Sequence, residues 1–172
     1  EAFLQPLNAN AHERYAQLRN GTATPDDFIV HGGLALLELL TARGLHIIIL
    51  SGNPHDQITA EAEMLGLTGF CNGHVYGHTD ANNFTKQAVL EKLMAEESFT
   101  GEEFIMFGDG AAEIEATCNL GGLPIAVCSD EHQNGSGRID ENKRAVLLEA
   151  GANVVIADYR EPNTLLNLII GK

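Results

Sequence analysis

The hydrophobic residues of this chain fall into two kinds of run that alternate along the sequence. Four short runs, over residues 45–50, 104–107, 124–128 and 153–156, are apolar at nearly every position. A strand needs this pattern when both of its faces are buried, because neither face meets water. We therefore predict four strands of a parallel sheet that is covered by helices on both sides.

Longer amphipathic segments lie between the short runs. Their apolar spacing predicts helices over residues 34–43, 55–65, 85–95, 141–150 and 162–170, and a more polar helix over residues 8–20 precedes them. Gly44 and Gly66 follow two of these segments, and glycine readily adopts the left-handed conformation that ends a helix. Pro162 opens the last segment, at a position where a helix tolerates proline.

The alternation of strands and helices predicts an α/β fold, a doubly wound, Rossmann-like parallel sheet with helices on both faces. Sheets of this type bind ligands at the carboxyl ends of their strands. The residues that directly follow each predicted strand are therefore the candidate functional residues. We see no internal repeat and no linker, so we expect one α/β core over residues 26–172, with residues 1–25 as a separate helical element and linker.

Composition excludes several classes of function. The 172 residues include 10 Lys+Arg and 24 Asp+Glu, which gives a formal net charge of −14. A charge of this sign repels a phosphate backbone, so we expect no nucleic-acid binding. The apolar runs are too short to cross a bilayer, which predicts no membrane association and a cytoplasmic protein. The three cysteines are far apart in the sequence and predict free, buried thiols. The oligomeric state stays open.

The first candidate site residues follow the strand that ends at Leu50. Ser51, Gly52 and Asn53 place a hydroxyl and free backbone N–H groups before the helix that begins near residue 55. Such groups at the start of a helix favour an anion. The alternative is an N-capping turn, since Ser and Asn are both good caps.

Two acidic residues follow the strand that ends at Phe107. Glycines flank Asp109, and Glu113 lies one turn further along the next helix. Mg²⁺ prefers such carboxylate oxygens, usually one or two of them together with water and substrate phosphate. The alternative is that Asp109 caps the helix and Glu113 is a solvated acid of its first turn, which the helix dipole favours.

Lys86 opens the helix over residues 85–95, where the helix dipole disfavours a cation. A lysine there is suited to neutralise a phosphate or a crowded pair of carboxylates. The alternative is a solvated surface lysine. Of the seven histidines, only His74 and His78 show HxxxH spacing and none shows HxH spacing, so the sequence does not favour a zinc site.

Ser51, then Lys86, then Asp109 with Glu113 resemble the second, third and fourth motifs of the haloacid dehalogenase-like superfamily. The resemblance covers residues 29–158 and includes the segments LLELLTARGLHIIILSGN and FIMFGDGAAEIEA. This order of residues argues against the receiver domain of two-component signalling, in which the lysine comes last. A dinucleotide-binding domain is disfavoured too, because Gly108-Asp109-Gly110 lacks the third glycine of GxGxxG.

The resemblance implies a phosphohydrolase that uses Mg²⁺ and acts on a small phosphorylated metabolite such as a sugar phosphate. It implies that Asp109 ligates the metal directly and that Glu113 does so through water. It also implies that residues 1–25 are the remnant of a small helical cap that selects the substrate. The residues implied to hold the phosphate or balance its charge are Ser51, Gly52, Asn53 and Lys86.

The sequence departs from the family pattern at the nucleophile. The family uses an aspartate of a DxD motif after its first strand, and this chain has no DxD. Asp26-Asp27, Asp80 and Asp130 follow no suitable strand. The missing strand is the middle one of the fold, between those that end at Ser51 and Asp109, and its loss leaves two strand edges unpaired. We therefore expect the strand and its DxD upstream of Glu1. The alternative is a catalytically inactive binding or regulatory module.

A second departure concerns the lysine motif. Relatives that act on glycolate phosphate or hexose phosphates usually have a Lys-Pro-x-Pro signature at this point, whereas this chain reads Phe84-Thr85-Lys86-Gln87. The sequence therefore leaves the substrate open.

Overall fold

The computed structural model describes residues 13–79 and 84–171, and residues 13–20 form a helix. Five strands follow: β1 (Ile49–Pro54), β2 (Val75–His78), β3 (Ile105–Gly108), β4 (Leu123–Val127) and β5 (Val154–Ile156). The helices between and around them are α2 (Gly33–Ala42), α3 (His55–Met64), α4 (Thr68–Cys71), α5 (Lys86–Glu97), α6 (Ala111–Asn119), α7 (Glu141–Glu149) and α8 (Pro162–Ile169). Short 3₁₀ turns, η1 (Pro25–Asp27) and η2 (Gly101–Glu103), complete the described elements.

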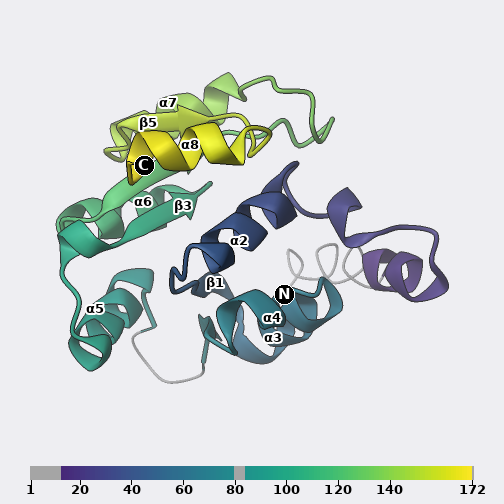
Figure 1. Ribbon diagram of the computed structural model, residues 1–172, viewed down its shortest axis with the longest axis horizontal. Coiled ribbons are helices and arrows are strands. Elements are labelled where there is room, and N and C mark those ends of the chain that lie inside the picture. Colours follow the sequence, from purple (N-terminus) through teal and green to yellow (C-terminus); the bar gives the residue numbers. More distant parts are fainter. Residues whose placement is uncertain (1–12, 80–83, 172) are drawn as a thin grey trace, which may run out of the picture.

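All strand pairs are parallel, but they form two sheets (Figure 1). One sheet has the order β1-β2 and the other has the order β3-β4-β5. No ladder joins β1 to β3 within the described ranges, so each of these strands keeps one unpaired edge. The α/β class predicted from the sequence is confirmed, and the sheet is interrupted where a middle strand is missing from the sequence pattern.

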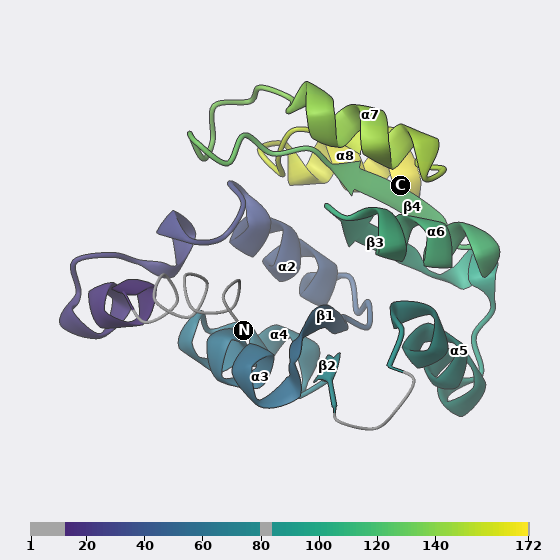
Figure 2. The same cartoon turned by 180° about the vertical axis from the view of Figure 1, so that it is seen from behind.

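Helices cover the sheets on both sides. In the two opposite views, α8 lies on one face of the β3-β4-β5 sheet, and α6 and α7 lie on the other (Figures 1 and 2). Helix α3 packs on β1 and β2, while α5 contacts both α6 and β1. Of the helices in the described ranges, none is long and apolar enough to cross a membrane.

Each sheet has its own hydrophobic core. One cluster of buried residues lies on the β1-β2 sheet and consists of Ala62, Cys71 and Val75. The other lies on the β3-β4-β5 sheet and consists of Ile114, Ala126, Cys128, Leu147 and Ala152. The three cysteines are free, as predicted, but Cys118 is exposed. Helices that bridge the two sheets therefore have to hold the molecule together.

Most predicted elements are present, with shifts at their ends. Gly44 and Gly66 have φ values of +71° and +72°, the left-handed conformation expected after a helix. The first strand was predicted over residues 45–50, but β1 begins at Ile49 and continues to Pro54. The prediction missed β2, because its four residues include only one aliphatic side chain, that of Val75.

The loop that follows β5 is held by a buried acid. Asp158, whose side chain is 4% exposed, accepts hydrogen bonds from Nε (2.8 Å) and Nη2 (2.6 Å) of Arg160. These bonds lower the pKa of Asp158, against the burial that opposes its ionisation. The Arg160 guanidinium also donates to the carbonyl of Gly135 at 3.3 Å, and this contact joins the loops after β4 and β5.

We expect Asp158→Asn to reduce the free energy of unfolding by about 1–2 kcal/mol at pH 7, because the charged hydrogen bonds to Arg160 are lost. The folded pKa of Asp158 is lowered. The stabilisation is therefore present above the unfolded pKa, about 3.9, and is lost as the pH falls through the folded value. Urea unfolding at pH 7 and pH 3 should show the difference from wild type shrinking at the lower pH. The exposed control Glu149→Gln should stay within about 0.5 kcal/mol of wild type at both values.

Candidate functional site

The turn between β3 and α6 places two carboxylates in different environments. Asp109 follows the last residue of β3, and its side chain is 68% exposed. Glu113 lies in the first turn of α6, and its side chain folds back so that Oε1 accepts the N–H of Gly110 at 2.8 Å. The side chain of Glu113 is only 8% exposed, so it is not the solvated first-turn acid of the alternative interpretation.

Lys86 meets Glu113 across the gap between α5 and α6. Its Nζ lies 2.7 Å from Oε2 of Glu113, and its side chain is 21% exposed. Thr85 caps α5 by accepting the N–H of Ala88 at 3.0 Å, which fixes the start of the helix that carries Lys86. Lys86 is therefore a paired and largely buried lysine, and the interpretation as a solvated surface lysine is wrong.

The glycines around Asp109 make room for Glu113. A Cβ on Gly108 would overlap Cγ of Glu113, and a Cβ on Gly110 would lie 2.9 Å from Oε2. Only glycine allows the Glu113 side chain to lie flat over this turn. The carboxylate of Asp109, between these two glycines, is open to solvent.

A second lysine, Lys143, approaches the turn from α7, and the sequence analysis did not single it out. Its Nζ lies 2.7 Å from Oε1 of Glu131 and 3.9 Å from Oδ2 of Asp109. Partial burial opposes its charge, but the hydrogen bond to Glu131 and the charges of Glu131, Asp109 and Asp140 raise the pKa of Lys143. Lys143 lies in the first turn of its helix, so the helix-dipole argument that identified Lys86 applies to it too.

Ser51, Gly52 and Asn53 lie inside β1 instead of at a helix start. Gly52 and Asn53 are exposed, and Oγ of Ser51 accepts the N–H of Asn53 at 3.1 Å. Helix α3 begins at His55 with Pro54 at its N-cap and no side-chain cap, so the N-capping interpretation of Ser51 and Asn53 is wrong. Their role in anion binding stays a prediction.

The structure joins some of the candidate residues and not others. Lys86, Glu113 and Gly110 form one hydrogen-bonded unit, and Asp109 is directly adjacent to it in the turn. Among the described residues, no hydrogen bond or ion pair connects Ser51, Gly52 or Asn53 to this unit.

The donor set suits Mg²⁺ only in part. Asp109 offers an open carboxylate with its nearest described cation 3.9 Å away. Both oxygens of Glu113 are already engaged, one by Lys86 and one by Gly110. In the described ranges, no third His, Cys, Asp or Glu joins these two acids in a metal-binding group. Asp109 can thus hold Mg²⁺ together with water and phosphate oxygens, a mixture that this ion accepts.

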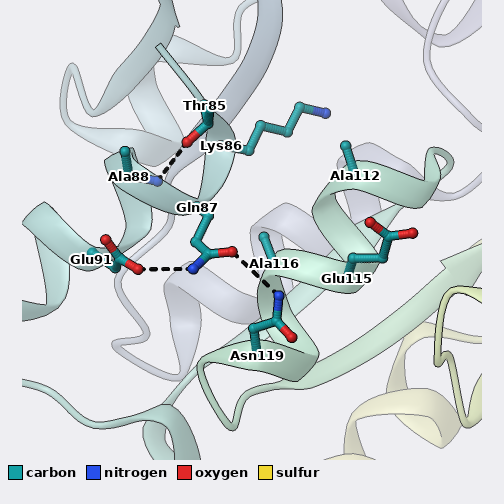
Figure 3. Close-up of a pocket in the computed structure, with 9 residues that line it drawn as sticks. All are labelled: Thr85, Lys86, Gln87, Ala88, Glu91, Ala112, Glu115, Ala116 and Asn119. Carbon is teal, nitrogen blue, oxygen red and sulfur yellow. Dashed lines mark hydrogen bonds between the residues drawn. The ribbon is translucent and has the colours of Figure 1, made fainter. Parts of the chain in front are cut away.

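A pocket of ≈ 290 Å³ lies beside this unit, between the first turns of α5 and the outer side of α6 (Figure 3). Gln87 crosses its lining, donating to Glu91 at 2.9 Å and accepting from Asn119 at 3.3 Å. The Lys86 side chain takes no part in these hydrogen bonds and extends toward the N-terminal turn of α6, where it meets Glu113. Lys86 is among the residues that line the pocket, whereas Asp109 and Glu113 are not, so the pocket shares only Lys86 with the hydrogen-bonded unit and with Asp109.

Two of the acids considered as replacement nucleophiles, Asp27 and Asp130, have other roles. Asp27 closes a capping box with Thr24, by accepting its N–H at 2.7 Å. Asp130 accepts hydrogen bonds from Nε and Nη2 of Arg138, at 3.1 and 2.8 Å, and from Ser136. Partial burial opposes its ionisation, but these bonds lower the pKa of Asp130. Asp80 lies outside the described residues.

A family model and two curated relatives match this chain, and all three are hydrolases by name. A family model described as haloacid dehalogenase-like hydrolase matches residues 6–121. Phosphoserine phosphatase from Campylobacter jejuni is 30% identical over 114 residues, which cover 60% of this chain and 54% of that protein. Phosphoglycolate phosphatase from Rhodospirillum rubrum is 32% identical over 98 residues, which cover 57% of this chain and 40% of that protein. The chain thus spans about half the length of these curated relatives.

A solved structure shows the same fold. A haloacid dehalogenase family hydrolase from Deinococcus radiodurans, crystallised with bound phosphate and sodium, superposes with a TM-score of 0.66. The match covers 81% of this chain and 59% of that chain, at 18% sequence identity. At this identity the likeness establishes the fold alone.

We expect Gly108→Ala to destabilise the protein by about 1–3 kcal/mol, because the added methyl group displaces the Glu113 side chain from a packed position. Gly69→Ala is the matched control, since nothing lies within 4 Å of a Cβ at that helical glycine. The control should be neutral or slightly stabilising. Thermal or urea unfolding of both variants measures the difference, and equal stability would contradict the packing role of Gly108.

We also expect a double-mutant cycle with Lys86→Met and Glu113→Gln to give a coupling energy of about 0.5–3 kcal/mol. Each single variant leaves its largely buried partner without a counter-charge, whereas the double variant removes both charges. Urea unfolding of the four proteins measures the coupling. A parallel cycle on the exposed pair Lys92 and Glu96 of the same helix should give no more than about 0.5 kcal/mol.

Proposed function

Because the chain belongs to the haloacid dehalogenase-like hydrolase family, we propose that it forms the catalytic core of a Mg²⁺-dependent phosphatase for a small phosphate monoester. The observation that carries the proposal is the buried pair of Lys86 and Glu113 beside the open carboxylate of Asp109. A cation and an open carboxylate thus lie together at the carboxyl end of β3, where this class of fold binds ligands, and this supports the proposal.

Lys86 supplies the positive charge that a phosphate dianion needs. The protein as a whole carries a formal charge of −14, which repels such a substrate unless local cations offset it. Glu113 holds the Lys86 ammonium in place by the 2.7 Å ion pair, and the Gly110 N–H holds Glu113. The ammonium is thus positioned before substrate arrives, which lowers the reorganisation needed in the transition state.

Asp109 is the residue that would hold Mg²⁺ directly, and Glu113 would contribute through a water molecule. When bound, Mg²⁺ neutralises the phosphate oxygens and helps to orient the phosphoryl group. The hydrogen bonds of Glu113 to Lys86 and Gly110 support the indirect role, because a metal bound directly to either oxygen would lie next to a donor that already occupies it. The proposed phosphate ligands on the other sheet are the Ser51 hydroxyl and the backbone N–H groups of Gly52 and Asn53.

We place the nucleophile in a strand between β1 and β3, in a segment outside the given sequence. The unpaired edges of these two strands support this position, because one parallel strand would pair with both. Its aspartate would attack phosphorus, release the alcohol and form an aspartyl-phosphate, which water then hydrolyses to inorganic phosphate and the free carboxylate. In the same proposal, residues 1–25 belong to a small cap that selects the substrate.

The names of the curated relatives support a small phosphate monoester as the substrate class. Phosphoserine and phosphoglycolate, named for those two proteins, are small phosphate monoesters, as is a sugar phosphate. Arg14 and Arg19 are exposed on the helix over residues 13–20, where a second anionic group of a substrate could meet them. We therefore propose a small phosphorylated metabolite as the substrate.

The competing proposal is a family member that binds phosphate esters without hydrolysing them. What favours it is the engagement of Asp27 and Asp130 in structural hydrogen bonds, since neither is then free to attack phosphorus. Such a protein would have the same fold and the same Lys86–Glu113 unit. It would bind the phosphate ester together with the metal, and no hydrolysis would follow.

The test measures the inorganic phosphate that the full-length gene product releases from phosphoserine, phosphoglycolate and hexose phosphates. Each substrate is assayed once with Mg²⁺ and once with a chelator. We expect activity only with Mg²⁺, and we expect Lys86→Ala to lower kcat/KM about 100- to 1,000-fold, because one preorganised charge on the phosphoryl group is lost. Lys92→Ala, on the exposed side of the same helix, is the matched control and should leave kcat/KM unchanged.

Activity that survives both Lys86→Ala and the chelator contradicts the mechanism. Binding of the same esters with Mg²⁺ and no phosphate release favours the non-catalytic alternative. Circular dichroism of each variant separates loss of the fold from loss of the charge.

A further inference from the structure

Two histidines and a glutamate converge at the end of the β1-β2 sheet that is opposite the candidate active site. We propose that His46, His74 and Glu97 form a binding site for Zn²⁺ or a similar transition-metal ion. This site shares no residue with the proposed phosphatase centre. It lies at the amino ends of β1 and β2, whereas the phosphatase residues lie at carboxyl ends of strands.

The three side chains already stand at distances close to those of a zinc site. Nδ1 of His46 lies 2.8 Å from Oε2 of Glu97, and Nδ1 of His74 lies 3.8 Å from Oε1 of the same residue. Each residue offers one ligand atom, and these atoms all lie within 4.8 Å of one another. Tetrahedral zinc with bonds of about 2.0–2.2 Å keeps its ligand atoms roughly 3.3–3.5 Å apart. The two histidine–Glu97 distances therefore lie within about half an ångström of the spacing in a zinc site.

The backbone around the cluster is fixed by the fold. The N–H of Ile49 donates to the carbonyl of His74 at 2.9 Å, and the N–H of His74 donates to the carbonyl of Cys71 at 2.8 Å. Parallel pairing of Ile49 with Val75 keeps the segments that carry His46 and His74 side by side. Their rings stand edge to face with centroids 4.4 Å apart. The site is thus largely preorganised, which reduces the cost of ordering it on binding.

The surroundings suit a metal that enters from solvent. His46, His74 and Glu97 have side chains that are 44%, 33% and 27% exposed. The hydroxyl of Tyr76 lies 3.4 Å from Nδ1 of His74, the same nitrogen that faces Glu97, so metal binding at this nitrogen would replace the Tyr76 contact. Imidazole nitrogens favour Zn²⁺ over Mg²⁺, which prefers oxygen ligands, so this site and Asp109 would select different ions.

A metal here would fasten α5 to the β1-β2 sheet. Glu97 is the last residue of α5, and Lys86, at its other end, is paired with Glu113 of α6. The described contacts of α5 with β1 are few compared with its contacts with α6. A bond from Glu97 through the metal to both histidines would add a second strong attachment of this helix, and we expect it to stabilise the fold.

The test is titration of the metal-free protein with Co²⁺, whose visible absorption is intense only in tetrahedral sites, followed by displacement with Zn²⁺. We expect one Co²⁺ per chain and a rise in Tm with Zn²⁺, because an ion that binds only the folded state stabilises it. We expect each of three variants to weaken Zn²⁺ binding by more than roughly 100-fold: His46→Ala, His74→Ala and Glu97→Gln. Loss of a residue that only hydrogen-bonds to a metal ligand costs roughly 10- to 100-fold, and loss of the ligand itself should cost more.

Two further variants are controls. His132→Ala removes an exposed histidine remote from the cluster, and Asp109→Asn removes the proposed Mg²⁺ ligand; both should keep the Co²⁺ spectrum and the Tm rise. Absence of one-to-one binding at micromolar Zn²⁺, or a spectrum that survives loss of His74, overturns the proposal. Loss of the signal in Asp109→Asn alone assigns the metal to the phosphatase centre and also overturns it. None of these outcomes depends on whether the protein hydrolyses phosphate esters.

Discussion

The 2.7 Å ion pair between Lys86 and Glu113 is the contact on which the arrangement of this molecule depends most. Its two residues belong to different helices, and those helices pack against different sheets. With no backbone ladder between β1 and β3 in the described ranges, contacts through α5 and the packing of α2 on α8 align the two sheets. A largely buried ion pair is suited to this task, because its energy depends steeply on geometry and an unpaired partner is costly to bury.

The same pair explains the local sequence around Asp109. Glu113 reaches Lys86 only if its side chain lies back over the turn, and that path is open only because positions 108 and 110 lack a Cβ. The two glycines thus make room for the side chain of the buried acid, Glu113. This division gives the two carboxylates different chemistry: Glu113 is a fixed counter-charge, and Asp109 is free to take a cation. Lys143, held by Glu131, limits the excess negative charge around Asp109 from the other side.

Sequence reasoning succeeded where a residue's conformation or local environment is decided by its neighbours in the chain. The left-handed glycines at 44 and 66 and the misplaced cation Lys86 at a helix start are of this kind. It failed where the outcome depends on which strands lie side by side. The short strand β2 has no apolar run, and its pairing with β1 is what places His74 near His46. Spacing rules such as HxH search along one element, so they miss histidines that two parallel strands bring together.

Helix α5 therefore has an electrostatic contact at each end. At its first residue a cation, placed against the helix dipole, is held by Glu113; at its last residue Glu97 faces two histidines. The unfavourable position of Lys86 is tolerated because Glu113 supplies a full negative charge at 2.7 Å, whereas the end of the helix carries only a partial positive charge. The contact at Glu97 is weaker, since His46 and His74 are partly exposed and carry charge only when protonated. The end of α5 next to the candidate active site is thus the better fixed of the two, as positioning a catalytic charge requires.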